Sequence, residues 1–297
     1  MAESGVRSVG VLGCGQMGGG IAQVCATAGF ETHVREAGQE PLERGMSSIL
    51  RALDSAAERG RLSAEDRTAI EGRLHATTDL ADLAACDIVI EAVTEDLDLK
   101  CAVWREADAA VQPDAVFASN TSSLTVAAMA GSTGRADRFV GMHFFFPVPA
   151  MRLVEVVRTV TTSDETFERA TAFAREIGKE PIAAKDQSGF TVNLLLVPYL
   201  LDAIRALERG VASTEDIDRG MQLGCGHPMG PLTLCDLVGL DTLQQVAEYM
   251  YAEHREVRYA PPPLLTRMTL VGLHGRKSGR GFYDYSADPP APLGLGV

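Results

Sequence analysis

Two residues of this 297-residue chain, His143 and Glu155, could together move a proton. An imidazole has an unperturbed pKa of about 6.5, so it can accept or release a proton near neutral pH. A carboxylate bonded to its other ring nitrogen would fix the tautomer and stabilise the imidazolium. Glu155 follows His143 across a turn expected at Pro147 and Pro149, which can fold two strands side by side. Taken alone, a histidine in such an apolar segment is also typical of a buried core residue.

A second chemical feature is the glycine-rich turn Gly13-Cys14-Gly15-Gln16-Met17-Gly18. Its first glycine permits a tight turn, the second lets the backbone approach a pyrophosphate, and the third allows close helix packing. Glu36 stands at the end of the next expected strand, where it would bind ribose hydroxyls and repel a 2′-phosphate. Arg35 should face the opposite side of that strand. Glycine turns and solvated acids also occur for structural reasons, but this context favours NAD.

The elements that must position these residues are short apolar strands separated by helical patterns. A helix is expected over Gln16–Ala28, directly after the glycine turn. The alternation is typical of a doubly wound parallel sheet, so the first part of the chain is predicted to be an α/β domain of the Rossmann type. The strands expected are Ser8–Leu12, Glu31–Val34, Asp87–Val93, Ala115–Ala118 and Phe139–Phe145.

The later part of the chain is predicted to be helical, without a convincing strand. We place the boundary after Lys185, which gives a NAD-binding Rossmann domain over residues 1–185 and an all-helical domain over 186–297. The tail Asp288–Val297, rich in proline and glycine, is predicted to be disordered. The helices expected are Phe190–Arg209, Ser213–Gln222, Pro231–Tyr251 and Pro263–Leu273.

Composition narrows the partners and the compartment. A net charge of -13, from 27 basic and 40 acidic residues, argues against nucleic acid, although a local basic patch could hold one anionic cofactor. No membrane segment is expected, because the most apolar stretch, Thr191–Leu201, is too short and contains Pro198. The six cysteines form no CxxC pair and no signal peptide is recognised, which favours a cytoplasmic protein. No metal site is predicted.

Further distinctive segments follow one another along nearly the whole chain. They include Ser-Asn-Thr-Ser-Ser-Leu at 119–124, Gly-Met-His-Phe-Phe-Phe-Pro-Val-Pro at 141–149 and Leu-Val-Glu-Val-Val at 153–157. Others are His-Pro-Met-Gly-Pro at 227–231 and Gly-Arg-Lys-Ser-Gly-Arg-Gly-Phe-Tyr at 275–283. In order and spacing, these segments resemble the 3-hydroxyacyl-CoA dehydrogenases, especially the short bacterial 3-hydroxybutyryl-CoA enzymes.

The resemblance implies a catalytic constellation. His143 would accept the hydroxyl proton of a 3-hydroxyacyl thioester while a hydride passes to NAD, and Glu155 would orient the imidazole. Ser122 and Asn193 would bind the substrate oxygen, where negative charge develops when the ketone is reduced. Asn193 lies at the start of the helical domain, so it would reach the site only if the cleft lies between the domains.

The resemblance also implies binding residues and an assembly state. Arg59 matches a basic residue near the coenzyme A phosphates, although it could equally belong to a solvated helix end. The helical domain would bind substrate and form a homodimer. Glu95 and Lys100 could otherwise be ordinary charges on a helix surface. The matches to cofactor-binding positions, besides the glycine turn and Glu36, are Glu95, Lys100, Asn120, Ser122 and Lys277.

Three positions depart from the family pattern. Phe146 replaces the asparagine of His-Phe-Phe-Asn-Pro, Leu194 replaces the arginine of Val-Asn-Arg-Leu, and Ala52 replaces a polar residue in the coenzyme A region. Phe146 would either line the substrate pocket, making it tighter and more apolar, or pack outward into the sheet. The departures leave the His143–Glu155 pair in place but leave the substrate open.

Three hypotheses for function follow. The leading one is an NAD-dependent oxidoreductase that interconverts a short-chain (S)-3-hydroxyacyl-CoA, such as 3-hydroxybutyryl-CoA, and its 3-oxoacyl form. The second is a dehydrogenase of specialised metabolism whose substrate, for example a glyceryl group, is carried by acyl-carrier protein. The third is a catalytically retired, crystallin-like Rossmann dimer, against which the retained His143, Glu155, Ser122 and Asn193 argue.

Overall fold

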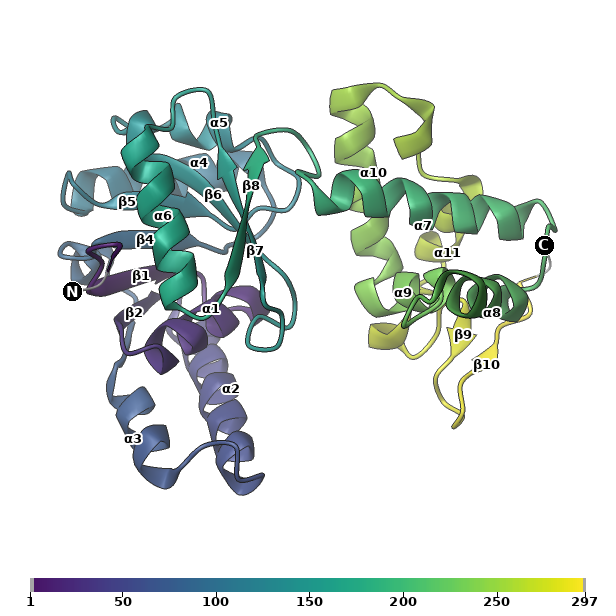
Figure 1. Ribbon diagram of the computed structural model, residues 1–297, viewed down its shortest axis with the longest axis horizontal. Coiled ribbons are helices and arrows are strands. Elements are labelled where there is room, and N and C mark those ends of the chain that lie inside the picture. The colour runs from purple at the N-terminus through teal and green to yellow at the C-terminus, as the bar shows by residue number, and fades with distance from the viewer. Residues whose placement is uncertain (1–2, 296–297) are drawn as a thin grey trace. The chain divides into compact units, whose positions relative to one another are not determined.

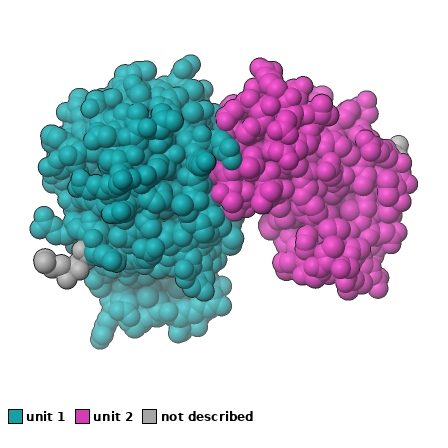
Figure 2. Space-filling model, turned by 45° about the horizontal axis from the view of Figure 1, so that its top comes forward, with its two compact units in different colours: residues 1–187 teal, residues 188–297 magenta. Residues whose placement is uncertain are grey.

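The computed structural model describes residues 3–295, and the chain divides into two compact units, residues 1–187 and 188–297 (Figure 2). Each unit has an apolar core of its own. The first core contains buried residues of the strands and of the helices against them, such as Val11 and Ile21. The second contains buried helix residues such as Leu201 and Met250, with Tyr259 among them.

The first unit is built around one sheet, in which eight strands of the described residues follow the order β3-β2-β1-β4-β5-β6-β7-β8 (Figure 1). Neighbouring strands are parallel except β6 and β7, which are antiparallel. The predicted Rossmann-type α/β fold of this part is thus confirmed. The strands are β1 (Ser8–Leu12), β2 (Glu31–Arg35), β3 (Leu74–Thr77), β4 (Ile88–Glu91), β5 (Val116–Ser119), β6 (Phe139–Phe144), β7 (Leu153–Arg158) and β8 (Glu180–Lys185).

The two edge strands, β3 and β8, were not predicted from the sequence. All residues of β3, and all but one of β8, are exposed or only partly buried. Neither strand therefore has the continuous apolar run that is typical of an inner parallel strand. The predicted domain boundary at residue 185 falls at the end of β8.

Helices flank the sheet, and three of them begin at side-chain caps. In each case the side chain before the helix accepts a hydrogen bond from a backbone amide of the first turn, which has no partner within the helix. The pairs are Ser63 with Asp66 N, Asp96 with Leu99 N, and Ser163 with Thr166 N. In Figure 1, α2 and α3 pack together and extend beyond the sheet. The helices of this unit are α1 (Gln16–Thr27), α2 (Gln39–Glu58), α3 (Ala64–Gly72), α4 (Leu97–Ala110), α5 (Val126–Ala130) and α6 (Asp164–Glu176), with short 3-10 turns at Leu80–Leu83 and Ala136–Arg138.

The second unit is helical, as predicted, but two details differ. The helix expected over Pro231–Tyr251 is broken at Gly239, whose φ of 98° interrupts the helical backbone. The helices are α7 (Val192–Glu208), α8 (Thr214–Cys225), α9 (Pro231–Val238), α10 (Leu240–His254) and α11 (Pro263–Leu270), with 3-10 turns at Val257–Tyr259 and Arg276–Ser278.

The second difference lies in the tail. The prediction of a disordered segment without strands is wrong for its described part, because β10 (Ala291–Pro292) pairs with β9 (Tyr283–Asp284) in an antiparallel ladder. A strand of two residues has no periodicity from which it could be predicted. The last two residues of the predicted tail lie outside the described ones. Across residues 3–295, no helix combines the length and apolar character needed to cross a membrane.

Candidate active site

The two residues of the predicted proton-transfer pair lie on adjacent strands. His143 on β6 and Glu155 on β7 are directly opposite each other in the antiparallel register, so their side chains lie on the same face of the sheet. His143 Nδ1 and Glu155 Oε2 are 2.7 Å apart. His143 is 6% exposed and Glu155 is fully buried. The carboxylate therefore holds the imidazole in one orientation and favours a proton on Nδ1.

The loop between these strands is held firmly in place. Lys179 Nζ donates to Val148 O at 2.6 Å and to Met151 O at 2.8 Å. Val148 is buried, and a Cβ added at Gly20 of α1 would stand only 2.9 Å from Val148 Cβ. The loop thus packs directly on the backbone of the first helix, just after the glycine turn.

The glycine turn has the geometry that a dinucleotide requires. Gly13 has a φ of 98°, and a Cβ added at Gly18 would lie 1.9 Å from Gly13 O. Gly15 is different, because a Cβ added there would meet no atom of the described residues within 4 Å. The first and third glycines therefore shape the turn, and the second leaves open space where a pyrophosphate can approach the start of α1. These residues fit the cofactor.

Glu36, the predicted ribose-binding acid, lies beside the glycine turn. Its Oε2 accepts from Cys14 N and its Oε1 from Ala37 N, both at 2.8 Å, so the carboxylate is fixed beside the glycine turn. Each carboxylate oxygen can accept a further hydrogen bond, which leaves capacity for ribose hydroxyls. Arg35 is partly buried, and its Nε has no hydrogen-bond partner among residues 3–295.

A cavity of about 570 Å³ extends from this turn along α2 to the loop after β6. Glu36 lines it at one side, and Phe146 lines it from the loop. Phe146 is 59% exposed, so the alternative that its ring packs into the sheet is wrong. Ala52, another of the three departures from the family pattern, also lines this cavity. The other lining residues include Gly15, Gln16, Arg44, Ser48, Ile49 and Pro147.

The loops after β4 and β5 bring together three of the predicted cofactor residues. Glu95 Oε1 accepts from Ser122 N at 3.1 Å, and Asn120 Oδ1 accepts from Phe144 N at 2.9 Å, next to His143. Carboxyl ends of parallel strands form the edge of the sheet at which Rossmann domains bind dinucleotides. Lys100, by contrast, is 1% exposed and makes an ion pair with Glu91 Oε1 at 2.5 Å.

Glu91 and Ser119 were missed by sequence reasoning. Glu91 is fully buried at the end of β4, where it accepts from Ser119 Oγ at 2.7 Å. A signal was available, because a carboxylate directly after the apolar run Ile88–Ile90 must find a buried partner. The identity of that partner could not be inferred, since it comes from other elements.

The remaining predicted residues belong to other elements. Arg59 is exposed at the end of α2, and its guanidinium donates to Ser55. In the helical unit, Asn193 lies in the first turn of α7. Lys277, also in that unit, makes an ion pair with Asp241 at 2.6 Å.

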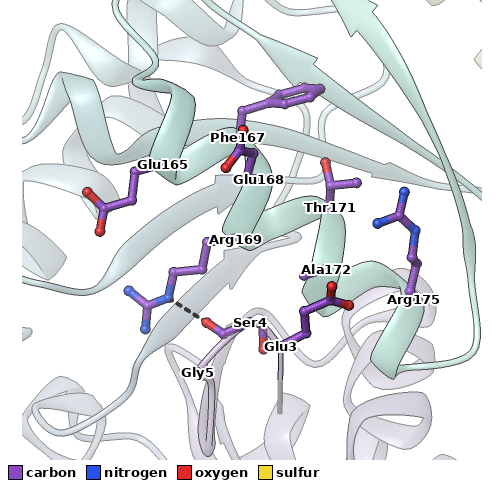
Figure 3. Close-up of a pocket in the computed structure, with 10 residues that line it drawn as sticks. All are labelled: Glu3, Ser4, Gly5, Glu165, Phe167, Glu168, Arg169, Thr171, Ala172 and Arg175. Atoms are coloured by element: carbon purple, nitrogen blue, oxygen red, sulfur yellow. Dashed lines mark hydrogen bonds between the residues drawn. The ribbon is translucent and has the colours of Figure 1, made fainter. Parts of the chain in front are cut away.

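A second cavity, of about 800 Å³, lies between the N-terminal segment and α6 (Figure 3). Arg169 Nε donates to Ser4 O at its edge, and the ring of Phe167 and several charged side chains line it. The predicted catalytic and cofactor residues are not among its lining residues within the described chain. Of these two cavities, the first is therefore the one that contains predicted site residues, among them Glu36 and Phe146.

Comparisons with known proteins identify the family of this chain. Residues 8–187 match the family model "3-hydroxyacyl-CoA dehydrogenase, NAD binding domain", and residues 189–285 match the C-terminal domain of the same family. A 3-hydroxybutyryl-CoA dehydrogenase of Mycobacterium tuberculosis is 48% identical over 282 residues, which cover 94% of this chain and 99% of the relative. The human mitochondrial hydroxyacyl-coenzyme A dehydrogenase is 41% identical, over 94% of this chain and 91% of the relative.

A solved structure is similar over the same length. The crystal structure of (S)-3-hydroxybutyryl-CoA dehydrogenase from Ralstonia eutropha superimposes with a TM-score of 0.91 at 43% identity. The alignment covers 95% of this chain and all of that one.

Proposed function

The chain belongs to the 3-hydroxyacyl-CoA dehydrogenase family, and from this premise we propose that it interconverts short-chain (S)-3-hydroxyacyl-CoA and 3-oxoacyl-CoA with NAD. Oxidation of 3-hydroxybutyryl-CoA to acetoacetyl-CoA is the reaction that its relatives' names support best. The cofactor and the dehydrogenase reaction type follow from the family itself.

The observation that carries the proposal is the buried His143–Glu155 pair, with 2.7 Å between Nδ1 and Oε2. In the oxidation, His143 Nε2 takes the proton of the 3-hydroxyl group while the hydride on the same carbon leaves. Glu155 stabilises the imidazolium that results and keeps Nε2 directed at the substrate. In the reverse direction the imidazolium returns its proton to the ketone oxygen.

The chain's other residues bind and orient. NAD, when bound, accepts the hydride from the substrate carbon. The glycine turn would hold its pyrophosphate, Glu36 its ribose, and Asn120 and Ser122 the end nearest the reaction. Ser122 and Asn193 would donate to the substrate oxygen, on which negative charge builds during ketone reduction. Arg59 is proposed to contact the coenzyme A phosphates and Lys277 the cofactor.

The second hypothesis, a thioester carried by acyl-carrier protein, is favoured by one observation. Phe146 presents an apolar ring to the cavity, and Ala52 supplies no polar group there, so hydrogen bonds that could hold coenzyme A are fewer. The intact pair of His143 and Glu155 and the family assignment both speak against the third hypothesis, a retired structural dimer.

The test is turnover of NADH, followed by its absorbance, with acetoacetyl-CoA and with the acetoacetyl thioester of acyl-carrier protein. We expect efficient oxidation of NADH with acetoacetyl-CoA, and weaker turnover with the protein-bound thioester. Turnover with the carrier-protein thioester alone would replace the proposal by the second hypothesis. Absence of turnover with both, in protein shown to bind NAD, would contradict dehydrogenase activity on 3-oxoacyl thioesters.

We further propose a cytoplasmic homodimer. All six cysteines are free thiols, which suits a reducing compartment. The helical unit exposes large apolar side chains, a feature typical of surfaces that a partner covers. They include Leu195, Val211, Leu223, Val257, Leu270 and Val271. Sedimentation of the 31.7 kDa chain should give twice that mass.

A further inference from the structure

Helix α5 is capped by a residue from a distant part of the chain. Its own N-cap residue, Thr125, makes no side-chain hydrogen bond to the first turn, which lies wholly within the described residues. The first two amides of the helix are bonded by Asp186, the residue that follows β8. Its Oδ1 accepts from Val126 N at 2.9 Å and its Oδ2 from Ala127 N at 2.7 Å. One carboxylate therefore satisfies two donors that the helix start leaves open.

The backbone of Asp186 is held by the sheet. Its amide donates to Arg158 O, at the end of β7, at 3.2 Å. The preceding residue, Lys185, is paired with Arg158 in the parallel register of β7 and β8. Because the carboxylate extends from the end of a paired strand, the cap connects α5 to the sheet itself.

Ser122 precedes this cap by one turn of chain. Its amide donates to Glu95 Oε1 at 3.1 Å, which holds the segment at its start. Val126 holds the segment at its end, because it is fully buried and a Cβ added at Gly141 of β6 would stand 3.2 Å from Val126 Cγ2. Gly141 lies on the same strand as His143. The cap therefore keeps the segment after Ser122 packed on the strand that carries the imidazole.

We propose that Asp186 is a positioning residue, which fixes the Ser122 hydroxyl relative to His143 by capping α5. Without the carboxylate, two amides lose their acceptor and the first turn of α5 loosens. Ser122 then samples positions away from the one at which it donates to the substrate oxygen, and a small displacement of such a donor slows the chemical step. The inference rests on the proposed function in taking Ser122 as a group that binds the substrate oxygen.

A purely structural role is the alternative, and a double-mutant cycle separates the two. The readout is the single-turnover rate of NADH oxidation, with enzyme in excess over NADH and with saturating acetoacetyl-CoA. Asp186→Ala should lower this rate about tenfold and Ser122→Ala about 100-fold. In the Ser122→Ala background, Asp186→Ala should cause less than about a twofold further loss, because the hydroxyl that it positions is gone. A tenfold loss in both backgrounds would overturn the inference.

A second variant covers the case in which Asp186→Ala does not fold. Asp186→Asn keeps the shape of the side chain and one acceptor oxygen, but its NH2 group cannot accept from the second backbone amide. It should therefore fold, lower the single-turnover rate about threefold and accelerate hydrogen exchange at the amides of Val126 and Ala127. A wild-type rate in this variant would contradict the inference.

The matched control is Asp87, a partly buried carboxylate of the same unit that also bonds two successive amides. Its Oδ2 accepts from Arg7 N at 2.8 Å and from Ser8 N at 3.1 Å, at the amino end of β1 and so at the opposite end of the parallel strands from Ser122. Asp87→Ala should lower the melting temperature, as Asp186→Ala does, and leave the single-turnover rate unchanged. An equal loss of rate would identify general destabilisation as the cause and overturn the inference. Failure of the wild type to turn over acetoacetyl-CoA would instead overturn the proposed function.

Discussion

His143 and Glu155 meet because an antiparallel register places them opposite each other, with Nδ1 and Oε2 2.7 Å apart. Both side chains are almost completely buried, so the pair is shielded from bulk water, where the interaction would be weaker. At the scale of single residues, the register of the two strands therefore fixes the orientation of the imidazole.

Replacement of His143 by alanine should lower kcat by at least about 100-fold, in line with the contribution of a positioned acid–base group. The Kd for NAD should change little, since the glycine turn and Glu36 are untouched. Glu155→Gln should lower kcat in the same direction, because a neutral amide stabilises the imidazolium less. Steady-state kinetics with acetoacetyl-CoA that show near-normal rates for both variants would return His143 to the role of a core residue.

Glu36 should make the enzyme prefer NAD to NADP. Its carboxylate is fixed by the amides of Cys14 and Ala37 and would repel a 2′-phosphate. The ratio of kcat/KM for NADH and NADPH measures this preference, and Glu36→Gln, which removes the charge at nearly constant shape, should reduce it. Equal efficiency of the wild type with both cofactors would contradict the assignment of Glu36.

Phe146→Asn should alter substrate use without unfolding the protein. The ring is 59% exposed, so its removal should shift the melting temperature by no more than about 2 °C. The amide adds a donor and an acceptor to the cavity wall, and kcat/KM for acetoacetyl-CoA should rise severalfold. Phe146→Leu is the control, because it removes aromatic bulk without adding polarity. Unchanged kinetics in Phe146→Asn would argue that the ring makes no contact with the substrate.

At the scale of elements, the loop between β6 and β7 and the loops after β4 and β5 are held by buried charged side chains. Lys179 bonds the carbonyls of Val148 and Met151, while Glu91 joins β4 to β5. Burial lowers the pKa of Lys179, which reflects the cost of keeping its ammonium out of water. The buried ammonium of Lys179 thus stabilises a loop that lines the cavity, although its burial is unfavourable.

Lys179→Met should therefore destabilise the protein. The free energy lost with the hydrogen bonds to the loop should exceed the free energy gained by no longer burying an ammonium. Two carbonyls lose their donor, and leaving such groups unsatisfied costs about 1–3 kcal/mol. We expect a free energy of unfolding lower by about 2 kcal/mol in denaturant titrations, together with a raised KM for the thioester. Arg152→Ala, which removes only an exposed ion pair with Glu180, is the control and should change neither. An unchanged or increased stability of Lys179→Met would show that the loop does not depend on this ammonium.

At the scale of the whole molecule, each unit contains its own core and its own buried carboxylates. In the helical unit, Asp236 is 1% exposed and accepts from the amides of Phe282 and Tyr283 and from the hydroxyl of Tyr285. Burial raises the pKa of Asp236, an effect that these hydrogen bonds reduce and nearby Asp218 increases. The carboxylate thus holds the segment after α11 in place, although burial disfavours its charged form.

This cost predicts a pH dependence of stability. Between the ordinary pKa of 3.8 and its raised value in the fold, the folded protein holds a proton on Asp236 that the unfolded chain has released. The contribution of Asp236 to the free energy of unfolding therefore falls as pH rises through this window. In denaturant titrations at increasing pH above 3.8, the free energy of unfolding of the wild type should fall relative to that of Asp236→Asn. A difference that grows in favour of the wild type with rising pH would contradict the assignment.

Local sequence was sufficient for the parts of the fold whose signal is local. The run Ser8–Leu12, the glycine turn and the following helix are read from neighbouring residues, and so is the acid Glu36 at the next strand end. The turn after His143 likewise made Glu155 a natural partner, because both residues belong to one hairpin. The assignment of Ser122, Asn193, Arg59 and Lys277 to the site came from family resemblance and stays a prediction.

Tertiary structure decided what depends on contacts between distant segments. Lys100 is spaced like a helix-surface residue, yet α4 packs so that its ammonium meets Glu91. Phe146 follows two apolar neighbours, yet the loop turns its ring outward. Edge strands such as β8 exist only because a neighbouring strand offers hydrogen bonds. Hydrophobic periodicity records which face of an element is buried, whereas the partner of a buried charge depends on how strand ends are brought together in space.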